Sequence, residues 1–137
     1  HQRYSGFISE LFRSGLIIPD ENVFWYTTET KENLFDDPEE VLKRLGDNTA
    51  VVCYNDEVAF GLVKCLLSAG RRVPEDVAVV SFDNSNLSWI SQVPITSLSY
   101  EDRNIGRIAA QKLVDILDGR DVSSEVLPWT FIQKESS

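Results

Sequence analysis

Two unbroken apolar runs, AVVCY at 50–54 and VAVVSF at 77–82, most constrain what this chain can fold into. Neither run alternates polar and apolar residues, as a strand with one solvated face would, so both faces of each strand need cover. The segment 56–69 between them has the pattern of a helix, and Gly70 follows it as a stop. A helix between two buried strands predicts an α/β fold with a parallel sheet and right-handed crossovers.

Apolar spacing and charge order predict the remaining elements. RYSGFISELFRSG forms a helix that stops at Gly15, and DDPEEVLKRLG places acidic residues first, basic residues last and Gly46 as a cap. An amphipathic helix is predicted at 101–119, with these residues on its apolar side: Ile105, Ala109, Leu113, Ile116 and Leu117. Further strands are predicted at 23–26, 95–99 and 126–132, and Pro128 makes the last an edge strand.

Size and charge exclude several classes of protein. The chain has 137 residues, 42% of them apolar, which suits one globular domain. No apolar run approaches the roughly 18 residues of a membrane span, and the start of the chain has no secretory pattern. The formal net charge of −9 indicates that this piece does not itself bind nucleic acid. Because methionine is absent even at the start, we expect a piece of a longer protein.

Catalytic, metal-binding and cofactor-binding patterns are missing from the sequence. It contains no G-x-S-x-G, no Walker glycine loop and no H-E-x-x-H, and its single histidine, His1, leaves a Ser–His–Asp arrangement without a base. Cys53 and Cys65 form no C-x-x-C pair and are predicted to be small buried apolar residues in a reduced, cytoplasmic compartment. We therefore expect no enzyme, no bound metal and no cofactor.

Short polar residues follow each of the two central strands. Asn55 follows the first strand and Asp83 follows the second, so both are expected at the carboxyl edge of the sheet, where α/β folds bind ligands. An amide that donates and accepts, beside a carboxylate that accepts from two hydroxyls, suits an uncharged polyol. The structural alternatives are that Asn55 caps the following helix and that Asp83 begins an ordinary turn.

Three other residues are candidates for the same edge. Arg3 lies just before the first helix and, by itself, is expected to be a solvated side chain. Trp25 and Tyr26 lie at the end of a predicted strand, where an aromatic ring can stack on a sugar or belong to the core.

The segments CYNDEVAFG, AGRRVPEDVAVVSFDNS, VPITSL and IGRIAAQKLVDILDG together resemble the effector-binding domain of LacI/GalR-type transcriptional repressors. That domain shares its fold with periplasmic sugar-binding proteins. Within the group, VFWYTTETKENLF and VVCYNDEVA are most similar to arabinose repressors, which join this domain to a GntR-type DNA-binding head. The resemblance implies a periplasmic-binding-protein-like parallel sheet with helices on both faces.

The resemblance also assigns site residues. It implies that Arg3, Asn55 and Asp83 contact the effector, with the aromatic wall of the pocket at Trp25 or Tyr26. Ser81 departs from the family, where a glycine is usual, and its side chain is expected to narrow the pocket. A second departure is Asn84, where an aspartate is common.

Family architecture further implies that residues 1–137 are mainly the C-terminal lobe of a two-lobed domain. Residues 1–98 and 122–137 belong to that lobe, whose first strand precedes the chain, and 99–121 normally cross to the missing lobe. We expect the helix at 101–119, without that cover, to pack on another chain or on its own sheet. The implied homodimer interface combines an outer face of helix 56–69 with the following loop: Phe60, Lys64, Leu67, Trp89 and Ile90.

The expected function is the sensing and dimerisation part of a cytoplasmic bacterial repressor of sugar utilisation. Its expected partners are a neutral monosaccharide (L-arabinose first), a second copy of the same chain, and operator DNA, which is bound through a head outside this chain. No membrane partner is expected. Two rivals remain on the same kind of sheet: a secreted solute-binding protein of a transport system, and an enzyme acting on a sugar or ester.

Overall fold

The structure is a computed structural model that describes residues 2–27, 29–100 and 105–137. Its order of helices and strands confirms the predicted α/β class. The elements are α1 (Gln2–Arg13), η1 (Asp20–Asn22), η2 (Lys31–Asn33), α2 (Pro38–Leu45), β1 (Ala50–Val52), α3 (Asp56–Ser68), β2 (Ala78–Phe82), α4 (Asn86–Ile90), β3 (Thr96–Ser99), α5 (Ile105–Leu117) and β4 (Thr130–Ile132).

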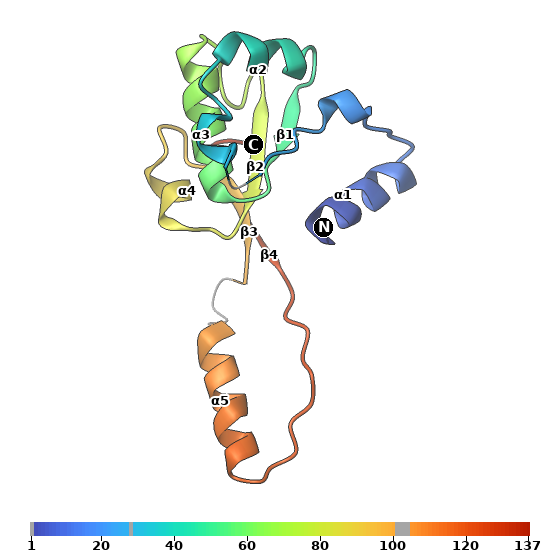
Figure 1. The fold of residues 1–137 in the computed structure, drawn as a ribbon, viewed down its shortest axis with the longest axis vertical. Helices are drawn as coiled ribbons and strands as arrows, with labels where there is room; N and C mark the ends of the chain where they lie inside the picture. The colour runs from blue at the N-terminus through green and yellow to red at the C-terminus, as the bar shows by residue number, and fades with distance from the viewer. Residues whose placement is uncertain (1, 28, 101–104) are drawn as a thin grey trace.

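The strands form one sheet in the order β1-β2-β3-β4 (Figure 1). Val51 pairs with Val79 and Ser81 pairs with Ser97 in parallel ladders, because helices α3 and α4 carry the chain back between these strands. β4 returns antiparallel to β3, with Phe131 opposite Leu98. The carboxyl ends of β1, β2 and β3 therefore share one edge of the sheet.

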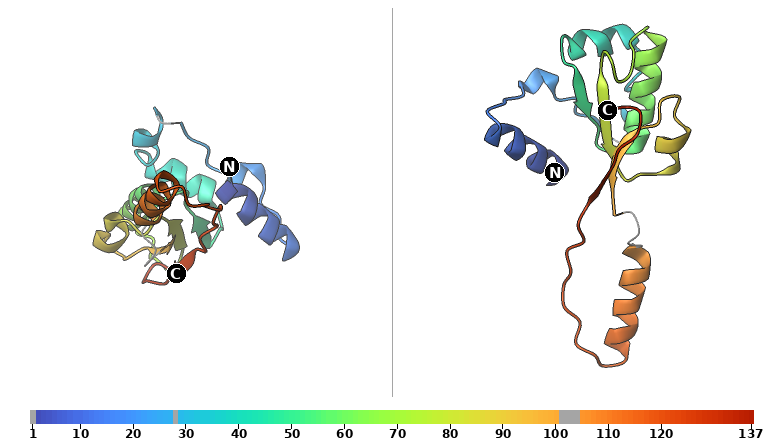
Figure 2. Two further views of the ribbon diagram at one scale, coloured as in Figure 1. Left: turned by 90° about the horizontal axis from the view of Figure 1, so that it is seen from below. Right: turned by 180° about the vertical axis from the view of Figure 1, so that it is seen from behind.

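Helices α2, α3 and α4 lie on one side of this sheet, and α1 lies out on the other side (Figures 1 and 2). The core sits between α3 and the strands, and the inner stripe of α3 is buried: Val58, Ala59, Leu62, Val63 and Leu66. Asp37 caps α2 by accepting from the amides of Glu39 and Glu40, and Gly46 ends that helix with a φ of 55°. The capping residues thus account for the two ends of α2, and a single apolar face accounts for the packing of α3 on the sheet.

Several sequence-based predictions about strands are wrong. Residues 23–26 are extended but form no strand, and the strand expected from 126 begins only at Thr130. A strand exists only where a neighbour accepts its hydrogen bonds, and within the described residues no strand pairs with the outer edge of β1. Instead Phe24 lies under the guanidinium of Arg44, 3.8 Å from ring centroid to Cζ. Residues 86–90, predicted to lie in a loop, form the short helix α4.

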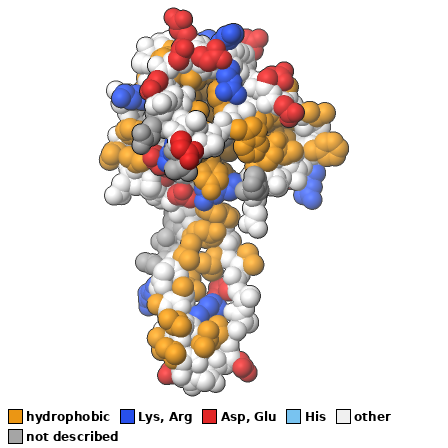
Figure 3. All heavy atoms as spheres, viewed as in Figure 1, with side chains coloured by type: hydrophobic (Ala, Val, Ile, Leu, Met, Phe, Trp, Pro, Cys, Tyr) orange, Lys and Arg blue, Asp and Glu red, His pale blue; other side chains and the backbone are white. Residues whose placement is uncertain are grey.

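Helix α5 projects from the sheet on an arm formed by the end of β3 and the extended return into β4 (Figure 1). The first four residues of the predicted helix, 101–104, lie outside the described residues. The apolar side of α5 is exposed, with Ile105, Leu113 and Ile116 between 50% and 57% accessible, and Figure 3 shows exposed hydrophobic side chains along the arm. The helix does not fold back over its own sheet, so that part of the expectation is wrong for this single chain.

Within the described ranges no helix is long and apolar enough to cross a membrane.

Candidate functional site

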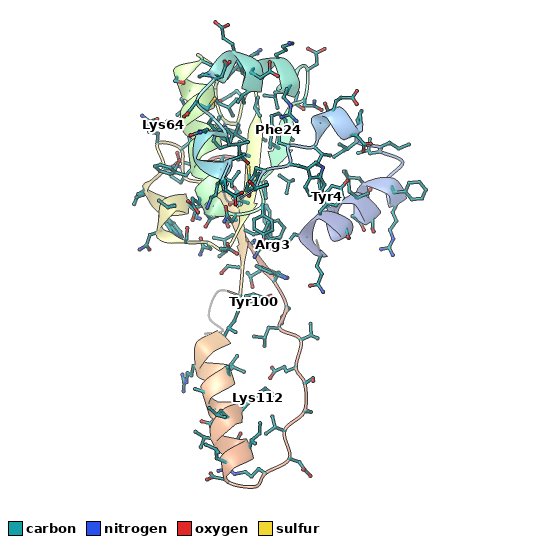
Figure 4. The ribbon with its side chains drawn as sticks, in the orientation of Figure 1. Arg3, Tyr4, Phe24, Lys64, Tyr100 and Lys112 are labelled. Carbon is teal, nitrogen blue, oxygen red and sulfur yellow. The ribbon has the colours of Figure 1, made fainter. Side chains whose placement is uncertain are left out.

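An ion pair joins two of the predicted site residues at the carboxyl edge of the sheet. Arg3 Nη2 donates to Asp83 Oδ1 at 2.7 Å, although the two residues are 80 positions apart in the chain. Arg3 Nη1 donates to the backbone oxygen of Tyr54 at 2.6 Å, so the guanidinium also holds the end of β1. Figure 4 shows Arg3 reaching from α1 to this edge of the sheet. The expectation of a freely solvated Arg3 is wrong.

Aromatic rings surround the guanidinium of Arg3. Its Cζ lies 4.9 Å from the ring centroid of Tyr54, 4.9 Å from that of Phe82 and 5.6 Å from that of Trp129. Trp129 in turn packs against Tyr100 with ring centroids 4.2 Å apart and planes tilted by 32°, and it meets Phe82 edge-on at 5.6 Å. The rings favour a cation over their faces, and together they give the ion pair an apolar border.

Sequence reasoning missed this aromatic border. Tyr54 and Phe82 directly precede the polar residues Asn55 and Asp83, and that adjacency was a usable signal. Trp129 follows α5 in the chain and directly precedes β4, so no local pattern pointed to it.

The predicted aromatic wall at Trp25 and Tyr26 is divided between two surroundings. Trp25 is 64% exposed and packs against Tyr4 of α1, with ring centroids 5.1 Å apart. Tyr26 packs partly buried against the core. Burial, followed by the nearby Cys53, Tyr54 and Glu57, raises the pKa of Tyr26, and the charge of Arg3 opposes that rise. Tyr26 therefore lies within electrostatic range of Arg3.

Asn55 caps α3, which was the structural alternative for this residue. Its side-chain oxygen accepts from the backbone amide of Val58 at 3.1 Å. The residue is partly exposed beside Tyr54 at the same edge of the sheet. A contact between Asn55 and a ligand stays a prediction.

The carboxylate of Asp56, 1% exposed, lies beneath the site. It accepts from Ser81 Oγ, from Ser97 Oγ at 2.8 Å and from the backbone amide of Ser85, which satisfies a charge that burial would otherwise penalise. Ser81 is 0% exposed and points at Asp56. The expectation that its side chain narrows a pocket is therefore wrong.

The backbone after β2 adopts an uncommon conformation. Asp83 has a φ of 98° and Asn84 a φ of 48°, both in the left-handed region that non-glycine residues seldom occupy. This bend turns the Asp83 carboxylate toward Arg3.

A shallow hollow of about 570 Å³ lies elsewhere, at the amino end of β1, and is bordered by α2 and the turn at Gly46. Its charged lining of both signs, which includes Glu40, Lys43 and Asp47, forms no convergent set of ligand groups. The carboxyl edge is the stronger candidate because charge pairing, aromatic rings and an unusual backbone meet there. Among the described residues, no group of three or more His, Cys, Asp or Glu side chains is arranged to hold a metal ion.

Comparison with known proteins gives a match along the whole chain. Residues 1–137 match the family described as periplasmic binding protein-like domain. An arabinose metabolism transcriptional repressor of Halalkalibacterium halodurans is 32% identical over 122 residues, which cover 85% of this chain and 32% of that protein. The HTH-type transcriptional repressor CytR of Escherichia coli is 28% identical over 130 residues, which cover 90% and 36%. The chain thus spans about a third of the length of these curated relatives.

Solved structures agree in fold. A transcriptional regulator CelR–cellobiose complex superposes with a TM-score of 0.81 at 31% identity, covering 98% of this chain and 42% of that one. The transcription regulator CcpA of Lactococcus lactis gives a TM-score of 0.80 at 26% identity, covering 98% and 49%. The predicted resemblance to the effector-binding domains of LacI-type repressors is confirmed.

Proposed function

This chain belongs to the family of periplasmic binding protein-like domains, and from that premise we propose that it is the effector-sensing part of a bacterial repressor of sugar utilisation. The observation that carries the proposal is the Arg3–Asp83 pair, set among aromatic rings at the carboxyl edge of a parallel sheet. Both curated relatives described above are transcriptional repressors, which supports a regulatory role rather than an enzymatic one.

The effector is a neutral monosaccharide. Arg3 and Asp83 compensate each other's charge, so a charged ligand has no counter-ion at this pair, whereas hydroxyl groups can accept from the guanidinium and donate to the carboxylate. The bordering rings of Tyr54, Phe82 and Trp129 offer apolar surface to the C–H face of a sugar ring. The arabinose repressor among the relatives makes L-arabinose the first candidate.

Regulation follows from a two-lobed arrangement in the whole protein. Residues 1–98 and 122–137 form one lobe, and the segment 99–121 crosses to a second lobe that covers the apolar side of α5. Sugar held between the lobes closes them and changes the affinity of a separate head for operator DNA. The net charge of −9 supports a DNA contact made outside this chain.

The whole protein acts as a dimer through a surface on α3 and α4, the α3–α4 patch, which consists of Phe60, Lys64, Leu67, Trp89 and Ile90. Trp89 and Ile90 are 56% and 69% exposed, and Lys64 points away from the sheet (Figure 4). Phe60 and Leu67 are half-buried against the core and expose only part of their surface. Two exposed apolar side chains on α4, and two partly exposed ones on the adjoining helix α3, support an interface here.

Calorimetric titration of the full-length protein with a panel of neutral pentoses and hexoses tests the proposal. We expect one neutral monosaccharide to bind and sugar acids and sugar phosphates to bind at least about tenfold more weakly, because the site offers no unpaired charge. Binding of none of the neutral sugars, or a preference for a charged one, would contradict the assignment.

A further inference from the structure

The segment that presents Asp83 is held in a costly conformation. Asp83 and Asn84 are consecutive non-glycine residues with φ values of 98° and 48°. Backbone of this kind persists only where surrounding contacts hold it, and such contacts concentrate at functional sites. The contacts that fix the turn from Asp83 to Ser85 therefore bear on the site.

Each backbone amide of this turn donates a hydrogen bond to a different acceptor. Asp83 donates to the carbonyl of Leu98 at 2.8 Å, and Asn84 donates to Ser97 Oγ at 3.0 Å. The amide of Ser85 donates to the buried carboxylate of Asp56. These contacts fix where the backbone turns, and they leave the side chain of Asn84 to be held separately.

The side chain of Asn84 is held by Lys134, which comes just after β4. The ammonium donates to Asn84 Oδ1 at 2.8 Å, to Ser88 Oγ at 2.8 Å and to the carbonyl of Ile95 at 2.9 Å. Three acceptors satisfy all three N–H groups of a lysine, and none of these acceptors is a carboxylate. The ammonium also lies 4.2 Å from the ring centroid of Trp89.

We propose that Lys134 is a positioning residue for the effector site, which holds Asn84 in its left-handed conformation and thereby aims the Asp83 carboxylate at Arg3. The inference rests on the proposed function, because it assigns Lys134 a role in sugar affinity. Lys134 touches no candidate ligand group directly, so its effect passes through one side chain and one bend of the backbone. Burial lowers the pKa of Lys134, so the ammonium is kept at this place against the cost of desolvation.

The test compares Asn84→Gly and Lys134→Met with the wild type, and uses Lys43→Met as the matched control. Lys43 lies on α2 with 80% of its side chain exposed, far along the chain from the turn. Asn84→Gly removes the acceptor for Lys134 but relieves the φ strain, so we expect its melting temperature to equal or exceed that of the wild type. If Lys134 only stabilises the fold, this variant binds sugar normally.

We expect amide exchange at residues 83–85 to accelerate about tenfold or more in both variants, because a charge-assisted hydrogen bond is lost. Sugar affinity of the full-length protein should fall by about tenfold in both, with Lys134→Arg recovering most of the loss and Lys43→Met changing neither measurement. Unchanged exchange at 83–85 in both variants overturns the inference. So does faster exchange with wild-type sugar affinity. If the wild type binds no neutral monosaccharide, the proposed function fails, and the exchange measurement alone still decides whether Lys134 holds the turn.

Discussion

At the scale of single residues, we expect the ion pair between Arg3 and Asp83 to matter for recognition rather than for stability. Its side chains are 28% and 43% exposed, and ion pairs in such surroundings contribute only about 0.2–1 kcal/mol to folding. The same pair offers a fixed guanidinium fork and a carboxylate to ligand hydroxyls, where each group left unpaired costs more. Changes at this pair should therefore affect binding before they affect folding.

Replacement of Asp83 by alanine is expected to weaken monosaccharide binding by roughly 1–3 kcal/mol, because sugar hydroxyls lose their acceptor. Calorimetry on the full-length protein measures the loss, and Asp47→Ala, an exposed carboxylate in the turn before β1, serves as the control. An Asp83→Ala protein that binds sugar as the wild type does would show that the site is elsewhere.

The thiol of Cys53 gives a prediction about pH. The residue is 5% exposed, and burial, helped by the charge of Asp56, raises the pKa of its thiol from 9.0 to about 12. In the unfolded chain the thiolate forms above about pH 9, whereas in the folded chain it forms only above about pH 12. The contribution of Cys53 to stability is therefore intact below pH 9 and is lost progressively as the pH rises from 9 to 12.

Denaturant unfolding at pH 8 and at pH 10.5 checks this sign. The free energy of unfolding should fall more steeply with pH in the wild type than in Cys53→Ala, since only the wild type releases the proton of Cys53 on unfolding. Burial also raises the pKa of the Cys65 thiol, and that residue contributes equally to both proteins. Thiol reagents should also leave Cys53 unmodified in the native protein at pH 8 and modify it in denaturant. Equal pH dependence of the two proteins would contradict the assignment.

At the scale of elements, α5 stands apart from the rest of the fold. It is a helix of 13 residues without a buried residue, and its apolar side faces solvent on the arm that carries it. An amphipathic helix gains most of its stability from packing that face, and isolated helices of this length are marginal in water. We therefore predict that α5 is covered by another chain in any ordered form of residues 1–137.

Hydrogen exchange of the isolated chain measures this cover. The amides from Ile105 to Leu117 should be protected, and their protection should rise with protein concentration because the cover comes from a second molecule. The amides of α3, which are buried within one chain, provide the internal control and should not depend on concentration. Rapid exchange throughout α5 at high concentration would contradict the prediction.

At the scale of the whole molecule, the α3–α4 patch is expected to join two copies of the full-length protein. Phe60→Glu combined with Leu67→Lys should give a monomer in sedimentation, because two charges would be desolvated at the interface. Because Phe60 and Leu67 also contact the core, their substitution can destabilise the fold as well as the dimer. Ile90→Lys avoids this problem, because Ile90 is 69% exposed and its substitution should change the stability of the fold little. Ile17→Lys, 82% exposed near the end of α1, is the control and should leave the dimer intact. An unaltered dimer in Ile90→Lys and in the double variant would rule out this surface.

The sequence by itself determined the parts of this protein that depend on neighbouring residues. The buried run at 77–82, the inner stripe of α3 and the cap at Gly46 follow from apolar periodicity and helix-end chemistry, which act over a few residues. The cover expected on both faces of 50–54 is wrong: β1 is an edge strand of the described sheet, and Val52 and Tyr54 are 38% and 57% exposed. The placement of Asn55 and Asp83 at one edge also followed, because parallel strands bring their carboxyl ends together.

Only the tertiary structure decided what depends on partners that are distant in the chain. Residues 23–26 have the composition of a strand, yet no described strand pairs with them, and pairing rather than propensity makes a strand. Arg3 meets Asp83 across 80 residues, and Trp129 and Lys134 reach the site from beyond the α5 arm. Contacts of this kind are set by how the elements pack, because the residues themselves carry no local pattern that identifies the partner.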